Sequence, residues 1–135
     1  MTKRPRINVI LRGEDSGGKV AIMDNAVSAG AAGPPLHHHG FDEAFYVLEG
    51  ELTFQLGDEL FTRGKGELAF APRDVPHTFA NRSGAEARVL IVCTPAGFER
   101  YFDWLAAREA GEDVPAEPPR NWPEVTTVGP RIGGV

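Results

Sequence analysis

The feature that most limits the fold of this chain is a succession of short segments in which apolar and polar residues alternate. The segment 51–56 is the clearest, because Leu52, Phe54 and Leu56 alternate with polar residues. Such alternation is typical of a strand with one face in a core. Strands are expected over residues 7–12, 19–28, 44–48, 51–56, 59–63, 67–70, 78–82 and 87–94. Many short strands joined by Gly, Pro, Asp and Asn turns predict an all-β sandwich or barrel.

The pattern changes after Pro95. Residues 97–111 carry large apolar side chains at intervals of three and four, which predicts an amphipathic helix ending near Gly111. These side chains are Phe98, Tyr101, Phe102 and Leu105. With 135 residues, 41% of them hydrophobic, the chain can bury one core but is too short for two ordinary domains. We therefore expect one domain over 1–111 and a proline-rich extended tail over 112–135, which could pack on the barrel through Trp122 or on a partner subunit.

Charge and composition exclude several classes of protein. The formal net charge of −5 argues against nucleic-acid binding. Apolar runs are far shorter than the roughly 20 residues that span a bilayer, and the start of the chain does not resemble a signal peptide, so we expect a soluble cytoplasmic protein that does not bind membranes. The single cysteine, Cys93, cannot form an internal disulfide, and its apolar surroundings predict a buried strand residue instead of a nucleophile.

Histidines and one glutamate stand at spacings that suit a metal ion. In an extended strand, His37 and His39 project from one face, and Glu43 shares that face if the strand continues. A further ligand must come from a strand that folding brings close, and His77 is the only isolated histidine available. Imidazole and carboxylate together form a mixed site that suits divalent Fe, Mn, Ni, Co, Cu or Zn.

Each of these residues also has an ordinary interpretation. The triple histidine is internal and stands between two prolines and an apolar segment, which disfavours the remnant of a purification tag. His38 is expected to face away from its two neighbours. Alone, Glu43 would more often be a solvated acid, and His77 a hydrogen-bonded core or surface residue. The joint match of both blocks favours a metal site.

Both blocks resemble the two signature motifs of the cupin superfamily, and the resemblance covers roughly residues 30 to 95. The first block reads PPLHHHGFDEAFYVLEGEL and includes Gly50; the second reads GELAFAPRDVPHTFAN and includes Gly66, Pro72 and Asn81. Two motif glycines are replaced, one by Ala31 and one by Asp74, and neither is a ligand position. The stretch TPAGFERYFDWLA also resembles the tail of small bacterial cupins similar to quercetin dioxygenases.

This resemblance implies an antiparallel β-barrel of the jelly-roll type with a short C-terminal helix. The family's metal ligands correspond to His37, His39, Glu43 and His77. The resemblance also implies one divalent metal per chain and a homodimer. For the homodimer, the outward side of residues 44–48 needs a cover, and the strand at 7–11 could pair with a sheet edge of the partner subunit.

The fold hosts many reactions, so the reaction must be inferred from the site. The leading hypothesis is a metal-dependent dioxygenase acting on a small phenolic or enolisable compound. Glu43 would be both a ligand and the base that removes a substrate hydroxyl proton. Phe45 and Phe79 share the strand parity of the ligands, so together with Phe54 they could line the substrate pocket. Ordinary core packing is the alternative role for these three residues.

Two other functions remain open. One is a non-catalytic cupin that binds a small ligand, and the other is a metal-dependent isomerase or lyase acting on a sugar or keto acid. A roomy apolar pocket beside the metal position would favour oxygenation, charged pocket walls would favour an isomerase or lyase, and a filled barrel would favour a structural role.

Overall fold

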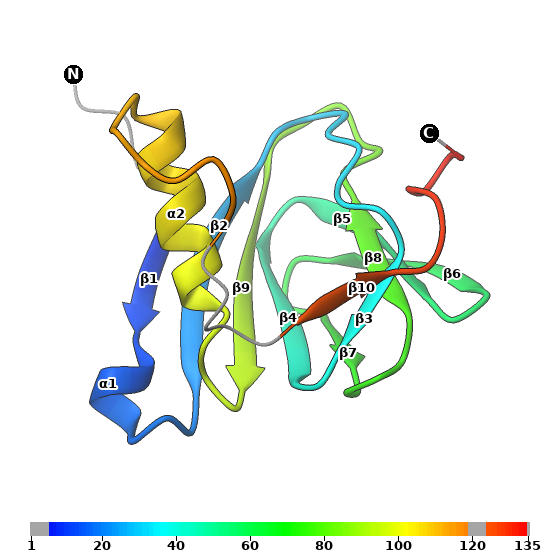
Figure 1. The fold of residues 1–135 in the computed structure, drawn as a ribbon. Coiled ribbons are helices and arrows are strands. Elements are labelled where there is room, and N and C mark those ends of the chain that lie inside the picture. The colour runs from blue at the N-terminus through cyan, green and yellow to red at the C-terminus, as the bar shows by residue number, and fades with distance from the viewer. Residues whose placement is uncertain (1–5, 119–123, 135) are drawn as a thin grey trace.

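Two antiparallel five-stranded sheets pack face to face in the computed structural model, which describes residues 6–118 and 124–134 (Figure 1). In spatial order, the first sheet contains β1 (Ile7–Leu11), β2 (Ala21–Val27), β9 (Ala87–Thr94), β4 (Asp42–Glu49) and β7 (Leu68–Ala71). The second contains β10 (Val125–Thr127), β3 (His37–His39), β8 (His77–Ala80), β5 (Glu51–Leu56) and β6 (Glu59–Gly64). The expected all-β jelly-roll architecture is confirmed.

Alternation along the strands explains how the core forms. In β9, the residues that face inward are all buried, and those between them are partly exposed. The same alternation marks β2, which pairs with β9 along its whole length. Cys93 is fully buried on the inner side of β9, as the sequence predicts. The core also contains the inward side chains of β4 and β5, among them Phe45, Val47, Leu52 and Phe54.

Three short elements are not predicted by the periodicity of the sequence. The single-turn helix α1 (Gly13–Ser16) joins β1 to β2, and β3 and β10 contain three residues each. β10 lies within the predicted extended tail, where Val125 pairs with His39 and Thr127 with His37. That part of the tail therefore belongs to the second sheet. Trp122, expected to anchor the tail, lies outside the described residues.

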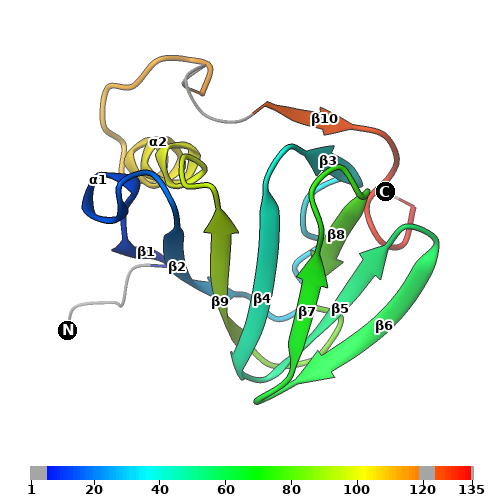
Figure 2. The same cartoon turned by 90° about the horizontal axis from the view of Figure 1, so that it is seen from below.

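The predicted C-terminal helix is present as α2 (Glu99–Glu109). It packs near β1 and β2, on the side of the first sheet that also faces β10 (Figure 2). The buried carboxylate of Glu99 fixes its start, because it accepts hydrogen bonds from the backbone N–H groups of Gly97 and Gly13 at 2.6 and 2.7 Å. Phe98 and Phe102 are buried beneath the helix.

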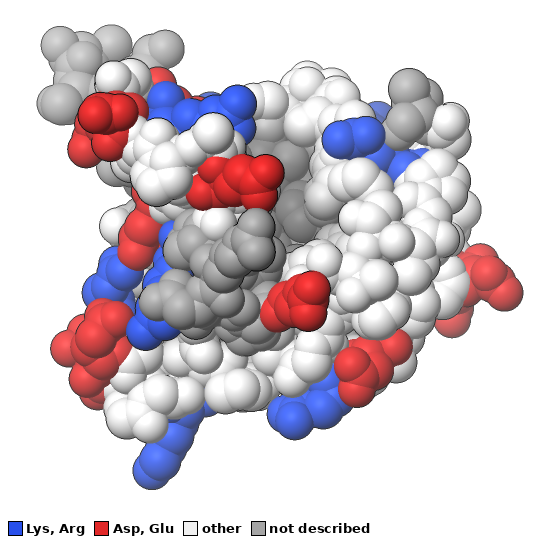
Figure 3. Space-filling view, in the orientation of Figure 1, with Lys and Arg blue, Asp and Glu red and all other residues white. Residues whose placement is uncertain are grey.

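The outer surface of the first sheet carries apolar side chains. Tyr46, Leu68 and Phe70 are 39%, 51% and 49% exposed on neighbouring strands β4 and β7. At the other edge of the sheet, β1 pairs with β2 of the same chain. On the face shown in Figure 3, acidic and basic side chains of the described residues are interspersed. Among the described residues, no helix has the length and apolar character needed to cross a membrane.

Candidate metal centre and cavity

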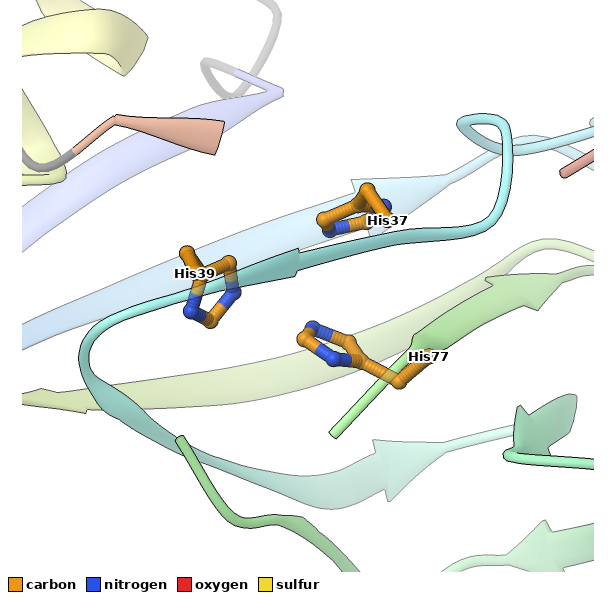
Figure 4. A group of neighbouring side chains, drawn as sticks. All are labelled: His37, His39 and His77. Atoms are coloured by element: carbon orange, nitrogen blue, oxygen red, sulfur yellow. The ribbon is translucent and has the colours of Figure 1, made fainter. Parts of the chain in front are cut away.

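Three histidines converge inside the barrel from two neighbouring strands. His37 and His39 project from β3 toward His77 on β8 (Figure 4). Their ligand nitrogens lie within 4.8 Å of one another. His39 and His77 are buried, and His37 is partly buried. The expected grouping of these three histidines is thus present, and the arrangement can bind a metal ion. His38, next to them in sequence, does not belong to the group.

Backbone carbonyl groups fix which nitrogen of each imidazole ring is free to bind a metal. Each ring donates a hydrogen bond from Nδ1: His37 to Pro35 at 2.7 Å, His39 to Phe41 at 3.0 Å, and His77 to Val75 at 2.9 Å. A carbonyl oxygen only accepts, so Nδ1 carries the hydrogen in every ring. Nε2 is left as the ligand atom, which is how outer hydrogen bonds orient metal-binding histidines.

Glu43 reaches the histidines from the opposite sheet. The strand that begins at His37 does not continue to Glu43 as the sequence suggested, because β3 ends at His39 and the chain crosses to β4 through Gly40 and Phe41. The carboxylate nevertheless meets the histidines inside the barrel. Its Oε1 lies 2.9 Å from Nε2 of His39 and 3.2 Å from Nε2 of His77.

The ionisable groups of the site shift one another's pKa values. Burial would raise the pKa of Glu43, but hydrogen bonds from His39 and His77 outweigh it and lower that pKa to about 2. Burial would lower the pKa of His77, but the hydrogen bond and charge of Glu43 outweigh it, so the pKa of His77 is raised. Burial lowers the pKa of His37, although its hydrogen bond with Pro35 opposes this.

The donor set fits a divalent cation. In both His39 and His77, Nδ1 faces a carbonyl oxygen and Nε2 faces the Glu43 carboxylate. Without a metal, each ring must carry two hydrogens to make both contacts, which places two positive charges beside one buried carboxylate. A divalent cation supplies the same two charges to three imidazole nitrogens and a carboxylate oxygen, a donor set suited to first-row transition metals.

Close packing of a loop on β8 sets the positions of His37 and His77. The backbone N–H of Asn81 donates to the carbonyl of Ala31 at 2.9 Å, and the Thr78 hydroxyl donates to the carbonyl of Pro34 at 2.6 Å. Gly33 has φ +72°, and a Cβ placed there would lie 1.8 Å from the carbonyl oxygen of Phe79. Glycine therefore permits the contact that brings β3 beside β8.

Asp74, which stands where the resembled motif has a glycine, has a backbone conformation that glycine adopts readily. Its φ is +66°, in the left-handed region that asparagine and aspartate tolerate better than most residues. Its backbone N–H donates to the carbonyl of His39 at 2.8 Å. Nearby, Arg73 forms an ion pair with Asp42 at 3.1 Å, next to Glu43. The second motif is thus fixed to both β3 and β4.

A cavity of about 430 Å³ opens beside the candidate metal ligands. Phe45 and Phe79 line it, as the sequence suggested. Phe54 does not: it is buried in the core, in ring contact with Phe45 and Phe79. The remaining wall was missed by reasoning from the motifs. It comes mainly from α2 with the preceding Phe98, from β10, and from the first sheet. The residues are Phe98, Tyr101, Phe102, Leu105, Val125, Thr127, Asn25 and Ile91.

Comparison with protein families finds that the model of the cupin domain matches residues 26–93. Comparison with curated proteins finds no significant match. Among solved structures, TT1209 from Thermus thermophilus is 27% identical with a TM-score of 0.57, and the alignment covers 69% of this chain and 87% of that protein. The polyketide cyclase RemF from Streptomyces resistomycificus is 29% identical with a TM-score of 0.58, over 65% and 63% of the two chains. A predicted oxalate decarboxylase from Thermotoga maritima has 22% identity, a TM-score of 0.62 and coverage of 66% and 78%.

Proposed function

The chain belongs to the cupin domain family, and we propose that it is a metal-dependent dioxygenase acting on a small phenolic or enolisable compound. The observation that carries this proposal is the cavity of about 430 Å³, which joins the metal-binding residues to walls that are mostly aromatic and aliphatic. Its volume lies in the range typical of sites for small organic ligands. The barrel therefore contains an open cavity. A metal site with a purely structural role would not need one.

His37, His39, His77 and Glu43 would hold the metal. When bound, a divalent transition metal would polarise a ligand oxygen and bring the ligand and dioxygen together. The carbonyl groups behind the imidazole rings keep Nε2 directed inward throughout. Fe, Mn, Ni, Co, Cu and Zn all suit this donor set, so metal identity is a matter for elemental analysis.

Glu43 would also act as the base. It is the sole carboxylate among the described residues that line the cavity. A phenol or enol bound beside it would transfer its hydroxyl proton to a carboxylate oxygen. The mostly apolar walls would limit the access of water to the resulting anion. Both atoms of dioxygen would then enter the product, so that the substrate supplies all four electrons and no external reductant is needed.

The chemistry of the walls disfavours a sugar phosphate or another anionic substrate. None of the described residues that line the cavity is a lysine or arginine, whereas phosphate or carboxylate recognition usually employs such residues. A cavity dominated by Phe, Tyr, Leu, Ile and Pro instead matches a flat, largely apolar ligand.

A second candidate shares the same substrate chemistry but does not use oxygen. RemF, one of the similar structures, is described as a polyketide cyclase, and removal of a proton beside a carbonyl group by Glu43 would also begin an isomerisation or cyclisation. The same aromatic cavity would serve such a metal-dependent isomerase or lyase. Consumption of dioxygen separates the two candidates.

The test is oxygen uptake by protein whose metal content has been measured after purification without a nickel column. Each metal-loaded form is mixed with a flavonol, a β-diketone and a catechol. We expect uptake with at least one compound, one dioxygen per product molecule, and loss of uptake in His77→Ala. Binding of these compounds without uptake, together with turnover under anaerobic conditions, would favour the oxygen-independent reaction.

A further inference from the structure

Asn25 is a buried polar residue whose side-chain oxygen lacks the hydrogen bond that such a residue normally makes. It lies on β2, is 7% exposed and lines the cavity. Its Oδ1 is buried and has no hydrogen-bond partner within the described part of the chain. Buried polar atoms are almost always paired, and an unpaired one destabilises the fold. The position therefore requires a reason other than stability.

The neighbours of Asn25 show what the strand itself would favour. Met23 and Val27, which face the same side of β2, are apolar members of the core cluster. Phe102 and Leu105 of α2 line the same cavity. An apolar residue at position 25 would continue this surface without an unpaired polar atom. The amide thus stands between apolar residues on its own strand and shares the cavity wall with Phe102 and Leu105.

We propose that Asn25 is a specificity-determining residue that hydrogen-bonds a hydroxyl or carbonyl group of the ligand whose other end is held at the metal-binding residues. This inference rests on the proposed function and adds a second recognition point to it. A carboxamide offers both an acceptor and two donors, so it can pair with either group. Bound ligand would supply the partner that Oδ1 lacks.

The strand register sets the length of such a ligand. Asn25 pairs with Val89 on β9, whereas Glu43, on the far side of β9, pairs with Cys93. The two cavity-lining residues are therefore two strands apart and four residues out of register. Strand spacing and rise place their Cα atoms roughly 15 Å apart. A ligand that reaches both must be elongated, with a polar group near each end, which favours a phenolic compound of two or three rings over a single-ring acid or a short diketone.

A pair of flavonols tests this assignment. The probe 3-hydroxyflavone carries only the adjacent hydroxyl and carbonyl groups that would bind at the metal, and quercetin adds hydroxyl groups on both outer rings. Their dissociation constants are measured anaerobically by calorimetry with the full-length, metal-loaded protein. We expect the wild type to bind quercetin about tenfold more tightly than 3-hydroxyflavone, a factor that corresponds to about 1.4 kcal/mol.

The variant Asn25→Leu has a similar size but no amide. We expect it to bind both probes with equal affinity, close to that of the wild type for 3-hydroxyflavone. Its melting temperature should be unchanged or higher, because the unpaired oxygen is removed. Asn25→Val, whose branched side chain suits a strand, provides a second test of the same loss. Asn8→Leu is the matched control, since Asn8 lies exposed on neighbouring β1 and its loss should alter neither affinity.

Each outcome decides a different claim. An undiminished preference for quercetin in the folded Asn25 variants would overturn the role of Asn25, as would a wild type that binds both probes equally. A wild type that binds neither probe would overturn both this inference and the proposed substrate class. If the preference depends on Asn25 but no oxygen is consumed, the inference stands and the dioxygenase reaction fails.

Discussion

His37 lies directly opposite His77 in the antiparallel pairing of β3 with β8, and their ring centroids are 4.6 Å apart. The pair joins the two sequence motifs at one point, because one histidine comes from each. The candidate metal centre therefore depends on correct pairing of two short strands. Damage to either the ligands or that pairing should appear first as loss of metal.

Replacement of His77 by alanine is expected to lower metal occupancy sharply. The variant removes one nitrogen of the converging group and the link between the motifs. The loss of affinity should exceed the roughly 10–100-fold cost of removing an outer hydrogen-bond partner of a ligand. His38→Ala is the control and should retain nearly full occupancy by elemental analysis. Equal losses in the two variants would show that the assigned ligand register is wrong.

Glu43→Gln separates metal binding from proton transfer. The amide keeps the size of the side chain but removes its charge and basicity, so metal retention should weaken. If the carboxylate is also the base, turnover per bound metal should fall further, by about 100-fold. Metal content and turnover are measured on the same preparation. A fall in turnover that merely follows occupancy would remove the proposed base.

The pairing of Glu43 with His77 should stabilise the metal-free protein most in mildly acidic solution, where the lowered pKa of His37 has the opposite, destabilising effect. The pKa of Glu43 is lowered from 4.5 to about 2, so its contribution is present above pH 4.5 and is lost as the pH falls toward 2. The pKa of His77 is raised from 6.5, so its contribution is present below pH 6.5 and is lost as the pH rises through the raised value.

Bound metal should reverse the loss of stability that is expected of the metal-free protein at alkaline pH. Metal binding displaces the protons from Nε2 of the imidazoles, so metal affinity rises with pH. Thermal unfolding from pH 4 to 9, with a chelator and with added divalent metal, checks both trends. A metal-free melting temperature that increases steadily up to pH 9 would contradict the stabilising pairing of Glu43 with protonated His77.

Gly33→Ala should destabilise the protein and release metal, whereas Gly30→Ala should do much less. Both glycines have positive φ, +72° and +73°, so both substitutions carry the roughly 1–2 kcal/mol cost of the left-handed conformation. A Cβ at Gly33 would also lie 1.8 Å from the carbonyl oxygen of Phe79, while nothing lies within 4 Å at Gly30. The expected excess cost, about 1–3 kcal/mol, is measured by denaturant unfolding, with metal content recorded in parallel.

We expect a homodimer that covers the outer surface of the first sheet. Leu68 and Phe70 are about half exposed there, and Phe70→Asp should shift the protein toward monomer in light scattering. Leu60→Asp is the matched control, because Leu60 is 55% exposed on β6 of the second sheet. Deletion of residues 1–12 tests the other half of the expectation, that the N-terminal strand stabilises the dimer. A monomeric wild type at micromolar concentration would contradict both.

The sequence predicts the elements whose periodicity is long enough to detect. β5 and β9 have the expected bounds, because the six residues of β5 alternate clearly and the eight residues of β9 include a run of apolar residues from Val89 to Cys93. β3 and β10 contain three residues each, too few to show a period, and they become strands only by pairing with each other and with β8.

The site is predictable where it rests on motif spacing. The three histidines meet as expected, but the crossing between sheets at Gly40 and Phe41 has no sequence signal. The spacing of the apolar residues over 97–111 predicts a helix, but it does not show that the apolar side of this helix lines a cavity. Asn25 belongs to no recognisable sequence motif. Only the packing of α2 near β2 reveals that it lines the cavity.

The cavity wall has a consequence for how this protein can change. The family model ends at residue 93, whereas Phe98, Tyr101 and Phe102 of the cavity wall lie beyond it, and Asn25 stands just before the matched region. The proposed metal ligands and much of the surface proposed to select the ligand thus lie in separate stretches of the chain. Under the proposed function, mutation or recombination beyond residue 93 would redirect the protein to a new compound while every proposed metal ligand is inherited intact.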